Sequence, residues 1–277
     1  MSNTIGGAIG AVVITVAFSL AASAQIREPG VQQNAPSVYD ELMKNTKPSG
    51  PAPKRDLIGE WAGPIGAKVN MPPPMTELGQ KRFSMNKGQE YTVSERNDPL
   101  NTCDPMGFPQ NVLYETRSIA FSQMPDRIVQ IFQYQRAWRE IFTDGRALPK
   151  NVGQKGGPDP RYYGYSVGHW DGDTSFVVDT VGMDDRVWLD HNGHPHSADL
   201  HVTERYERKD HDTLVLTVNI DDSKIYTKPW VATTTTYKWI PDQTFEEQLC
   251  VPSEAIQYMS IIGVPAGTAE GKTVKPR

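Results

Sequence analysis

Cysteine and histidine are scarce in this chain of 277 residues, which has two of the former and six of the latter. Cys103 and Cys250 stand far apart and neither belongs to a Cys-x-x-Cys pair, which excludes a cysteine-based zinc knuckle. A basic excess is also absent, because 28 lysines and arginines stand against 33 aspartates and glutamates, for a net charge of −5. Without surplus positive charge to neutralise phosphates, we expect no nucleic-acid partner.

Sequence motifs of several common enzyme classes are missing as well. No Gly-x-Ser-x-Gly elbow supports an α/β-hydrolase serine, and no Walker A loop or Gly-x-Gly-x-x-Gly after a strand supports a nucleotide site. Cys103 is followed by no nearby histidine, which argues against a thiol nucleophile. Any chemistry of this chain must therefore come from other residues.

The N-terminal segment has the pattern of an export signal. Residues 11–20 are an apolar core, and residues 22–24 read Ala-Ser-Ala, with small residues at the two positions that signal peptidase recognises. No lysine or arginine precedes this core, which is too short to span a membrane. We predict that residues 1–24 are a cleaved signal peptide. Its removal leaves no membrane span and places the protein in the periplasm or outside the cell.

The predicted export bears on whether the two cysteines form a disulfide bond. In an oxidising compartment Cys103 and Cys250 can form one disulfide bond, and the alternative is a pair of buried free thiols. We predict the disulfide. Residues 25–55 are dense in proline and glycine and predict a flexible N-terminal arm, followed by a single domain over residues 56–277 with a C-terminal helix and tail.

Short runs rich in Val, Ile, Thr, Tyr, Phe and Trp predict a mostly β domain. Turn sequences such as Thr-Asp-Gly-Arg and Trp-Asp-Gly-Asp-Thr separate these runs at spacings of roughly ten residues, which favours an antiparallel meander. Closing such a sheet hides its edges. We therefore predict an all-β fold, an antiparallel meander closed into a lipocalin-like β-barrel, with a sandwich or jelly roll as alternatives. The few short helices are expected after Thr76 and Ser253, as N-caps.

Two resemblances bear on this domain. The Gly-Glu-Trp of residues 59–61 resembles the Gly-x-Trp that starts the first strand of lipocalin-like (calycin) barrels, in which the tryptophan closes one barrel end and the cavity takes a small molecule. The segments GHWDGDTSFVVDTVG, WLD, GHPHSADLHVTERY and YTKPW resemble an abundant family of uncharacterised exported proteins of environmental bacteria. This second resemblance runs from about residue 57 to residue 254. It implies export and one domain, and no established activity.

Four of the six histidines, His191, His194, His196 and His201, gather in one short segment. A zinc or copper site would need three well-placed ligands. The spacing of the four histidines matches no defined metal-binding motif such as His-Glu-x-x-His. We therefore favour no metal, and keep a divalent metal held by these four residues as an alternative. A second alternative is that the histidines have a structural role, in a loop stabilised by hydrogen bonds between imidazole and aspartate side chains.

Proton transfer asks for less, because one histidine and one orienting carboxylate suffice. The candidates are His196 and His201, with Asp190 or Glu204 as the carboxylate. If residues 199–208 form a strand, His201 lies on a polar face that points to solvent or into a polar barrel interior, and Glu204 lies on the apolar face. Proton transfer in a cavity requires the interior position, so we expect His201 to line the inside of the barrel. A carboxylate on that face must be paired, and the candidate partners are Arg136 and Arg139.

Aromatic and basic residues of other strands predict a binding surface. Tyr165 and His169 share one face of their run, which suits the wall of a cavity or, equally, tyrosines in water. Arg136 stands beside Tyr134 and Trp138, where it could stack or hold a carboxylate. The predicted ligand-binding residues are Arg136, Arg139, Tyr134, Trp138, Tyr165, His169, Trp170, Tyr226 and Trp230.

Together these patterns predict an exported β-barrel that binds a small, partly aromatic or carboxylated molecule in its cavity. The first hypothesis is an enzyme of acid–base type, a lyase, isomerase or hydrolase. The second is a carrier with the same cavity and no turnover, and the third is a metal-binding protein. No cofactor is predicted, and the sequence leaves the ligand and the oligomeric state open.

Overall fold

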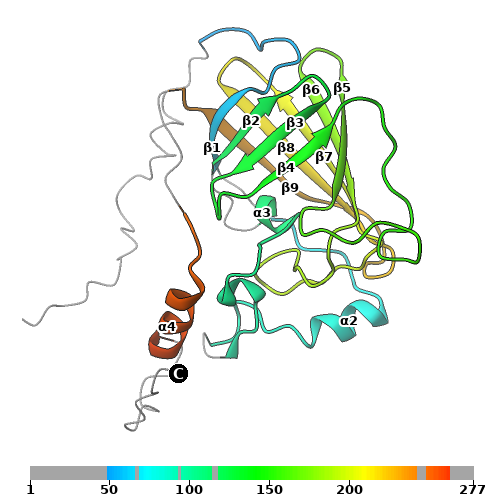
Figure 1. The fold of residues 1–277 in the computed structure, drawn as a ribbon, viewed down its shortest axis with the longest axis vertical. Helices are drawn as coiled ribbons and strands as arrows, with labels where there is room; N and C mark the ends of the chain where they lie inside the picture. The colour runs from blue at the N-terminus through cyan, green and yellow to red at the C-terminus, as the bar shows by residue number, and fades with distance from the viewer. Residues whose placement is uncertain (1–48, 66–68, 93–94, 114–117, 242–247, 263–277) are drawn as a thin grey trace, which may run out of the picture. The chain divides into compact units, whose positions relative to one another are not determined.

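The computed structural model describes residues 49–65, 69–92, 95–113, 118–241 and 248–262. The predicted signal peptide and most of the predicted N-terminal arm lie outside these residues. In the described part of the chain, nine strands form one closed barrel in chain order, and the first strand pairs with the last (Figure 1). The predicted all-β barrel is confirmed.

The strands are β1 (Gly59–Ile65), β2 (Ile119–Gln123), β3 (Arg127–Phe132), β4 (Trp138–Phe142), β5 (Tyr165–Asp171), β6 (Ser175–Val181), β7 (His201–Arg208), β8 (Thr213–Asp221) and β9 (Trp230–Trp239). The helical segments are α2 (Glu77–Phe83), the 3-10 helix η2 (Pro99–Thr102), α3 (Gln110–Leu113) and α4 (Pro252–Ile262). The predicted N-cap of α2 is confirmed, because the Thr76 side chain accepts a hydrogen bond from the Gly79 N–H at 3.1 Å. None of the described helices is long and apolar enough to cross a membrane.

One pair of strands departs from the predicted antiparallel meander. β4 and β5 run parallel, and the other neighbours in the ring run antiparallel. Strand directions can alternate around a closed ring only when the number of strands is even, so a ring of nine must contain a parallel pair. Parallel neighbours need a long crossover, which residues 143–164 supply. β4 and β5 share only two residue pairs, Ile141 with Ser166 and Phe142 with Val167.

The register of β7 decides which way the histidine-bearing strand faces. Val202, Glu204 and Tyr206 are fully buried, whereas His201 and Thr203 are half-buried. Because side chains alternate across a strand, the polar face of this run lies outside the barrel. The expectation that His201 lines the interior is wrong, since burying the apolar face yields the larger hydrophobic gain.

Side chains of the hydrophobic core fill the barrel. Phe108, which precedes α3, is fully buried, and its ring centroid lies 4.1 Å from the guanidinium carbon of Arg139. Trp61 is equally buried, donates from its indole N–H to the Leu57 carbonyl at 3.0 Å, and packs beneath the guanidinium of Arg208 at 4.8 Å. Packed side chains therefore occupy the centre of the barrel, and a ligand has to bind along its wall or at its ends.

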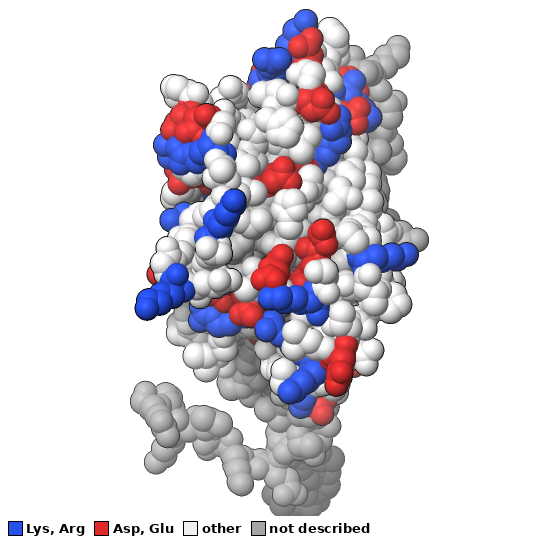
Figure 2. All heavy atoms as spheres, turned by 90° about the vertical axis from the view of Figure 1, so that its right-hand side faces the viewer, with Lys and Arg blue, Asp and Glu red and all other residues white. Residues whose placement is uncertain are grey.

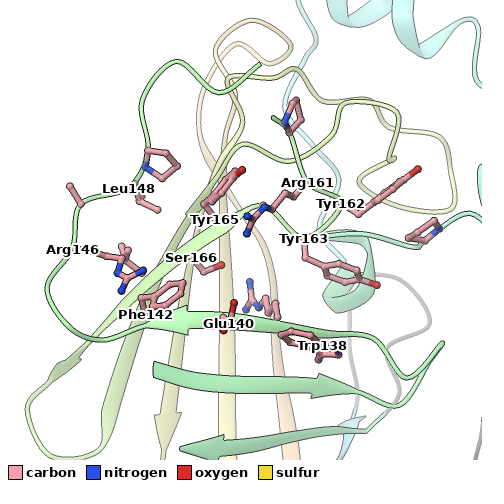
Figure 3. A pocket seen from close by; sticks show the side chains of 17 residues that line it. Trp138, Glu140, Phe142, Arg146, Leu148, Arg161, Tyr162, Tyr163, Tyr165 and Ser166 are labelled. Carbon is pink, nitrogen blue, oxygen red and sulfur yellow. The ribbon is translucent and has the colours of Figure 1, made fainter. Parts of the chain in front are cut away.

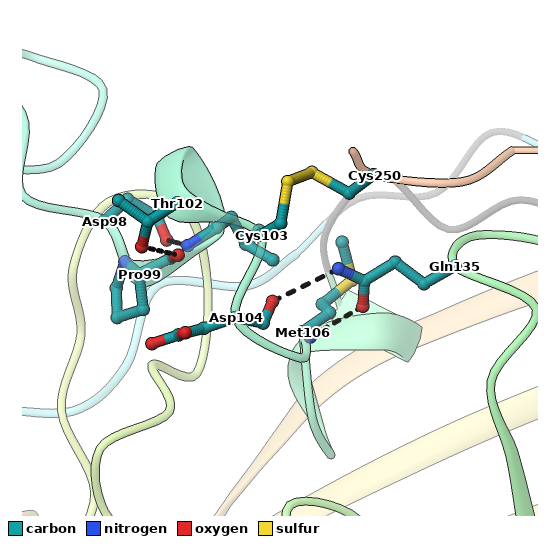
Figure 4. Close-up of a disulfide and its surroundings, with 9 residues drawn as sticks. Asp98, Pro99, Thr102, Cys103, Asp104, Met106, Gln135 and Cys250 are labelled. Carbon is teal, nitrogen blue, oxygen red and sulfur yellow. Dashed lines mark hydrogen bonds between the residues drawn. A yellow bond between two sulfur atoms is a disulfide. The ribbon is translucent and has the colours of Figure 1, made fainter. Parts of the chain in front are cut away.

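A disulfide bond joins Cys103, at the end of η2, to Cys250, which precedes α4 (Figure 4). The predicted pairing is confirmed. Beside it the Gln135 side chain donates to the Asp104 carbonyl at 3.1 Å and accepts from the Met106 N–H at 3.0 Å. These contacts hold together η2, the turn between β3 and β4, and the C-terminal segment.

Acidic and basic side chains are interspersed on the face shown in Figure 2. Several surface arginines are paired with aspartates, among them Arg186 with Asp184 at 2.6 Å and Arg205 with Asp171 at 2.8 Å. Exposed pairs of this kind contribute little to stability, but each neutralises its arginine. An arginine without such a partner is therefore a candidate for binding an anion.

Candidate functional site

A cavity of about 520 Å³ opens where β4 and β5 diverge (Figure 3). It exists because the pairing of these two parallel strands is short, so the crossover of residues 143–164 closes over a gap in the barrel wall. The lining residues are Pro105, Trp138, Arg139, Glu140, Phe142, Arg146, Ala147, Leu148, Pro149, Pro160, Arg161, Tyr162, Tyr163, Gly164, Tyr165, Ser166 and Val167.

The floor of this cavity belongs to a buried polar network inside the barrel. Arg139, whose side chain is 2% exposed, donates from Nη2 to both carboxylate oxygens of the fully buried Glu204, at 2.7 and 2.6 Å. The Tyr206 hydroxyl donates to Glu204 at 2.6 Å, and Arg139 Nε donates to the Gln130 side chain at 2.8 Å. The predicted pairing of Glu204 is confirmed, with Arg139 as the partner. Burial, followed by the charge of Glu204, raises the pKa of Tyr206 well above its usual value, so its hydroxyl stays a donor.

This network changes the expected role of Arg139. The residue lines the cavity as predicted, but its charge is balanced by a carboxylate that has no contact with solvent. A ligand anion would have to compete with that carboxylate inside a low-dielectric core, where a broken ion pair is costly. Arg139 therefore supports the shape of the cavity floor, and any anion must be held by another cation.

Aromatic side chains form the walls. Trp138 projects from the outer face of β4 and remains 58% exposed, which is unusual for so large an apolar surface. Figure 3 shows the rings of Trp138 and Tyr163 at the same end of the cavity. Burial raises the pKa of Tyr163 to about 12, so its hydroxyl is neutral at physiological pH. Phe142 and Leu148 add apolar surface at the other end.

Two arginines stand at the rim. Arg146 is paired with Asp144 at 2.5 Å, and its guanidinium lies 3.5 Å from the ring centroid of Phe142. Arg161 lies over the ring of Tyr165, with 4.3 Å between the guanidinium carbon and the ring centroid. Among the described residues, no carboxylate lies within ion-pair distance of Arg161. Arg161 is thus a cation held in place by an aromatic ring and available to a ligand.

The residues predicted for proton transfer are not brought together. His201 lies on the outer face of β7, where its Nε2 is 2.9 Å from Asp179 Oδ1 and its side chain is 41% exposed. His196 is buried in the loop before β7, with Nδ1 3.0 Å from the Ser197 carbonyl, and this burial lowers its pKa. Glu204 points into the barrel. None of these three lines the cavity, because strand alternation and the loop direct them to separate places.

Asp190 organises the histidine-rich loop. Its Oδ2 lies 2.6 Å from His194 Nδ1, and its Oδ1 accepts from the backbone N–H groups of Asn192 at 2.9 Å and His194 at 3.3 Å. Burial raises the pKa of Asp190, but hydrogen bonds and charge from His194 outweigh it and leave the pKa below its usual value. The His194 ring stacks on Phe83 of α2 at 5.0 Å. These contacts correspond to the alternative of a loop stabilised by imidazole and aspartate hydrogen bonds.

The metal alternative has no matching geometry. Within the described ranges, no group of three or more histidine, cysteine, aspartate or glutamate side chains converges in a way that could hold a metal ion. His194 and His196 share their segment, yet His194 bonds to Asp190 and His196 to a backbone carbonyl. The side chain of His201 lies outside the barrel, where it pairs with Asp179.

Three of the predicted ligand-binding residues do line the cavity, namely Trp138, Arg139 and Tyr165. His169 and Trp170 lie further along β5 and do not. Both residues follow Ser166 and Val167, the two residues that β5 pairs with β4, whereas the cavity lies at the start of β5.

The remaining four predicted ligand residues have other surroundings. The Tyr226 hydroxyl donates to the Pro195 carbonyl at 2.8 Å, and Trp230 meets the Tyr226 ring edge-on at 4.5 Å. Arg136 lies in the turn between β3 and β4, with a left-handed backbone at φ 48°. Tyr134 lines a separate, smaller pocket. Of the nine predicted residues, only those on β4 and at the start of β5 line the cavity, because the sequence does not show where the barrel wall is open.

Several lining residues were missed, chiefly Arg161, Arg146 and Leu148 of the crossover. One signal could have found them, since long loops without regular structure in a compact domain are often functional. Gly164 ends this crossover in a left-handed conformation at φ 64°, and a Cβ there would come within 2.7 Å of the Val181 carbonyl oxygen. This close approach of crossover and β6 sets the start of β5.

No family model, curated protein or solved structure matches this chain. The function therefore has to be inferred from the geometry of the site.

Proposed function

We propose that this protein binds a small aromatic carboxylate in the cavity between β4 and β5, as an exported binding protein without turnover. The observation that carries the proposal is the position of Arg161. It stands at the rim of an aromatic-walled cavity of about 520 Å³, stacked on Tyr165, without a carboxylate partner among the described residues.

The chemistry of the lining supports this ligand class. Ligand cavities of a few hundred cubic ångströms are mostly apolar, with a few polar groups that orient the ligand. A planar ring can pack against Trp138 and Tyr163 in offset or edge-on geometry. The guanidinium of Arg161 offers a planar fork of donors that matches a carboxylate, and its stacking on Tyr165 limits the entropy lost on binding.

Binding without turnover is the better supported of the two leading hypotheses. Proton transfer needs a histidine or carboxylate within reach of the reacting atom. His196, His201 and Asp190 do not border the cavity, and Glu140, which does, is paired with Arg127. Export is part of the proposal. The apolar segment of residues 11–20, the disulfide bond and the resemblance to a family of exported bacterial proteins support it.

Titration calorimetry with cinnamate, cinnamamide and cyclohexanecarboxylate tests the proposal. We expect cinnamate to bind most tightly, because the amide lacks the charge that Arg161 recognises and the cyclohexane lacks the aromatic face. Since Arg161 is exposed, its ion pair with the ligand is worth about a fivefold difference in affinity between acid and amide.

A matched pair of variants assigns this preference to the site. Arg161→Gln should remove the preference for the acid over the amide. Arg205→Gln, at a half-exposed arginine of β7 that pairs with Asp171 and does not line the cavity, should keep it. Equal affinities of acid and amide in the unmodified protein, or the same loss in both variants, would show that Arg161 does not hold an anion.

A further inference from the structure

A second pocket, of about 170 Å³, shares no residue with the cavity between β4 and β5. The chain segment before η2, η2 itself, the end of β3 and the histidine-rich loop meet around it. Most of its lining surface is polar, and the side chains that face it include Arg96, Asp98, Asn101, Tyr134 and His191. Its volume suits a molecule smaller than a typical drug-sized ligand.

Asp98 supplies an acceptor to this pocket. Its Oδ1 accepts from the Leu100 N–H at 2.9 Å, and among the described residues this is the only hydrogen bond to the carboxylate. Burial raises the pKa of Asp98 to about 6; the charge of Arg96 opposes the shift and the charge of Asp190 adds to it. At neutral pH the carboxylate is therefore ionised and poorly solvated, so a ligand that donates a hydrogen bond to it is favoured.

Asn101 supplies a donor. Its Nδ2 is buried and has no hydrogen-bond acceptor in the described part of the chain. A buried donor of this kind is destabilising unless a ligand or water accepts from it. Arg96 cannot accept this hydrogen bond, because a guanidinium group carries only donors; its Nη2 donates to the Gln89 carbonyl at 2.9 Å and its Nε to the Tyr91 carbonyl at 3.1 Å.

We propose that this pocket binds a small, uncharged, hydroxyl-rich molecule, a polyol or a monosaccharide, through Asp98 and Asn101. A hydroxyl group both donates and accepts, so neighbouring hydroxyls can donate to the carboxylate and accept from the amide. One cation and one anion, Arg96 and Asp98, face the pocket together, and this balance favours a neutral ligand over a carboxylate or an ammonium group. The site is independent of the aromatic cavity and of the function proposed for it.

Nuclear magnetic resonance with isotope-labelled protein tests the proposal with myo-inositol and D-glucose as probes. We expect at least one of them to shift the side-chain amide signals of Asn101 saturably. Asp98→Asn keeps an oxygen that can accept from the Leu100 N–H, so η2 stays capped, but it should weaken binding on the order of tenfold. Asp173→Asn, at an exposed aspartate that does not line the pocket, should leave the affinity unchanged.

The pH dependence gives an independent check. Binding should weaken as the pH falls through about 6, where Asp98 takes up a proton. His191 and Tyr134 also face the pocket and Asp190 acts on it electrostatically, so the same titration is run on Asp98→Asn, which should lose this dependence. Three results would overturn the proposal: no saturable shift with either probe, equal affinity in the unmodified protein and Asp98→Asn, or binding of acetate that strengthens below pH 6.

Discussion

Replacing Glu204 with glutamine removes the negative charge that balances Arg139 inside the barrel. The two side chains are 0% and 2% exposed, and the carboxylate accepts two hydrogen bonds from the guanidinium and one from Tyr206. The glutamine has nearly the same shape and still offers one oxygen, so packing changes little. What changes is that the guanidinium stays in a low-dielectric core without a counter-charge.

The expected cost follows from that burial. Removing one partner of a buried ion pair destabilises proteins by about 3–5 kcal/mol. In a domain of this size each kcal/mol lowers the melting temperature by roughly 2–4 °C, so we expect a decrease of roughly 6–20 °C. The double variant Arg139→Met/Glu204→Leu removes both charges, and it should be more stable than Glu204→Gln alone because no charge is left uncompensated.

Urea denaturation followed by tryptophan fluorescence measures these changes, with Glu207→Gln as the matched control. Glu207 lies on the same strand but outside the barrel, where it pairs with Lys209 at 2.5 Å between half-exposed side chains. Its replacement should cost about 0–1 kcal/mol. If the two single variants are equally stable, Arg139 does not depend on a buried counter-charge and the account of the barrel interior is wrong.

Two further predictions concern the disulfide and the buried histidine. Cys250→Ser opens a loop of 147 residues and should destabilise by about 2–5 kcal/mol in urea; reductant should destabilise the unmodified protein equally and leave the variant unaffected. Burial lowers the pKa of His196, so the unfolded chain binds a proton more readily than the folded one, and stability should fall as the pH drops below about 6.5. His196→Gln should flatten this dependence between about pH 7.5 and about pH 5, measured as the free energy of unfolding. An unchanged slope in His196→Gln would contradict the assignment.

The predictions from sequence were most accurate where a local rule governs the structure. The cap at Thr76 depends on one side chain and one nearby N–H, and it was predicted correctly. The pairing of Glu204 followed from finding a carboxylate on an apolar strand face, which left the partner open between two arginines. Alternation along residues 201–208 was likewise clear, but alternation alone does not tell which face points inward. For His201 the expectation of an inward position was wrong.

The cavity depends on relations that no local pattern contains. A closed ring of nine strands requires a parallel pair, the tertiary structure makes β4 and β5 that pair, and the opening follows from where their short ladder ends. Arg161 comes from a crossover whose proline and glycine residues predict only irregular structure. Its stacking on Tyr165 depends on how the crossover packs against the barrel, which is a tertiary contact.

The sequence by itself determined the β class, the alternating faces and the chemistry of the side chains available, because hydrophobic periodicity and turn residues act over a few neighbours. Only the tertiary structure decided which of those side chains meet. A barrel closes through contacts between residues far apart in the chain. Because this ring has an odd number of strands it contains a parallel pair, and the cavity lies beside that pair in the barrel wall and not at the barrel centre.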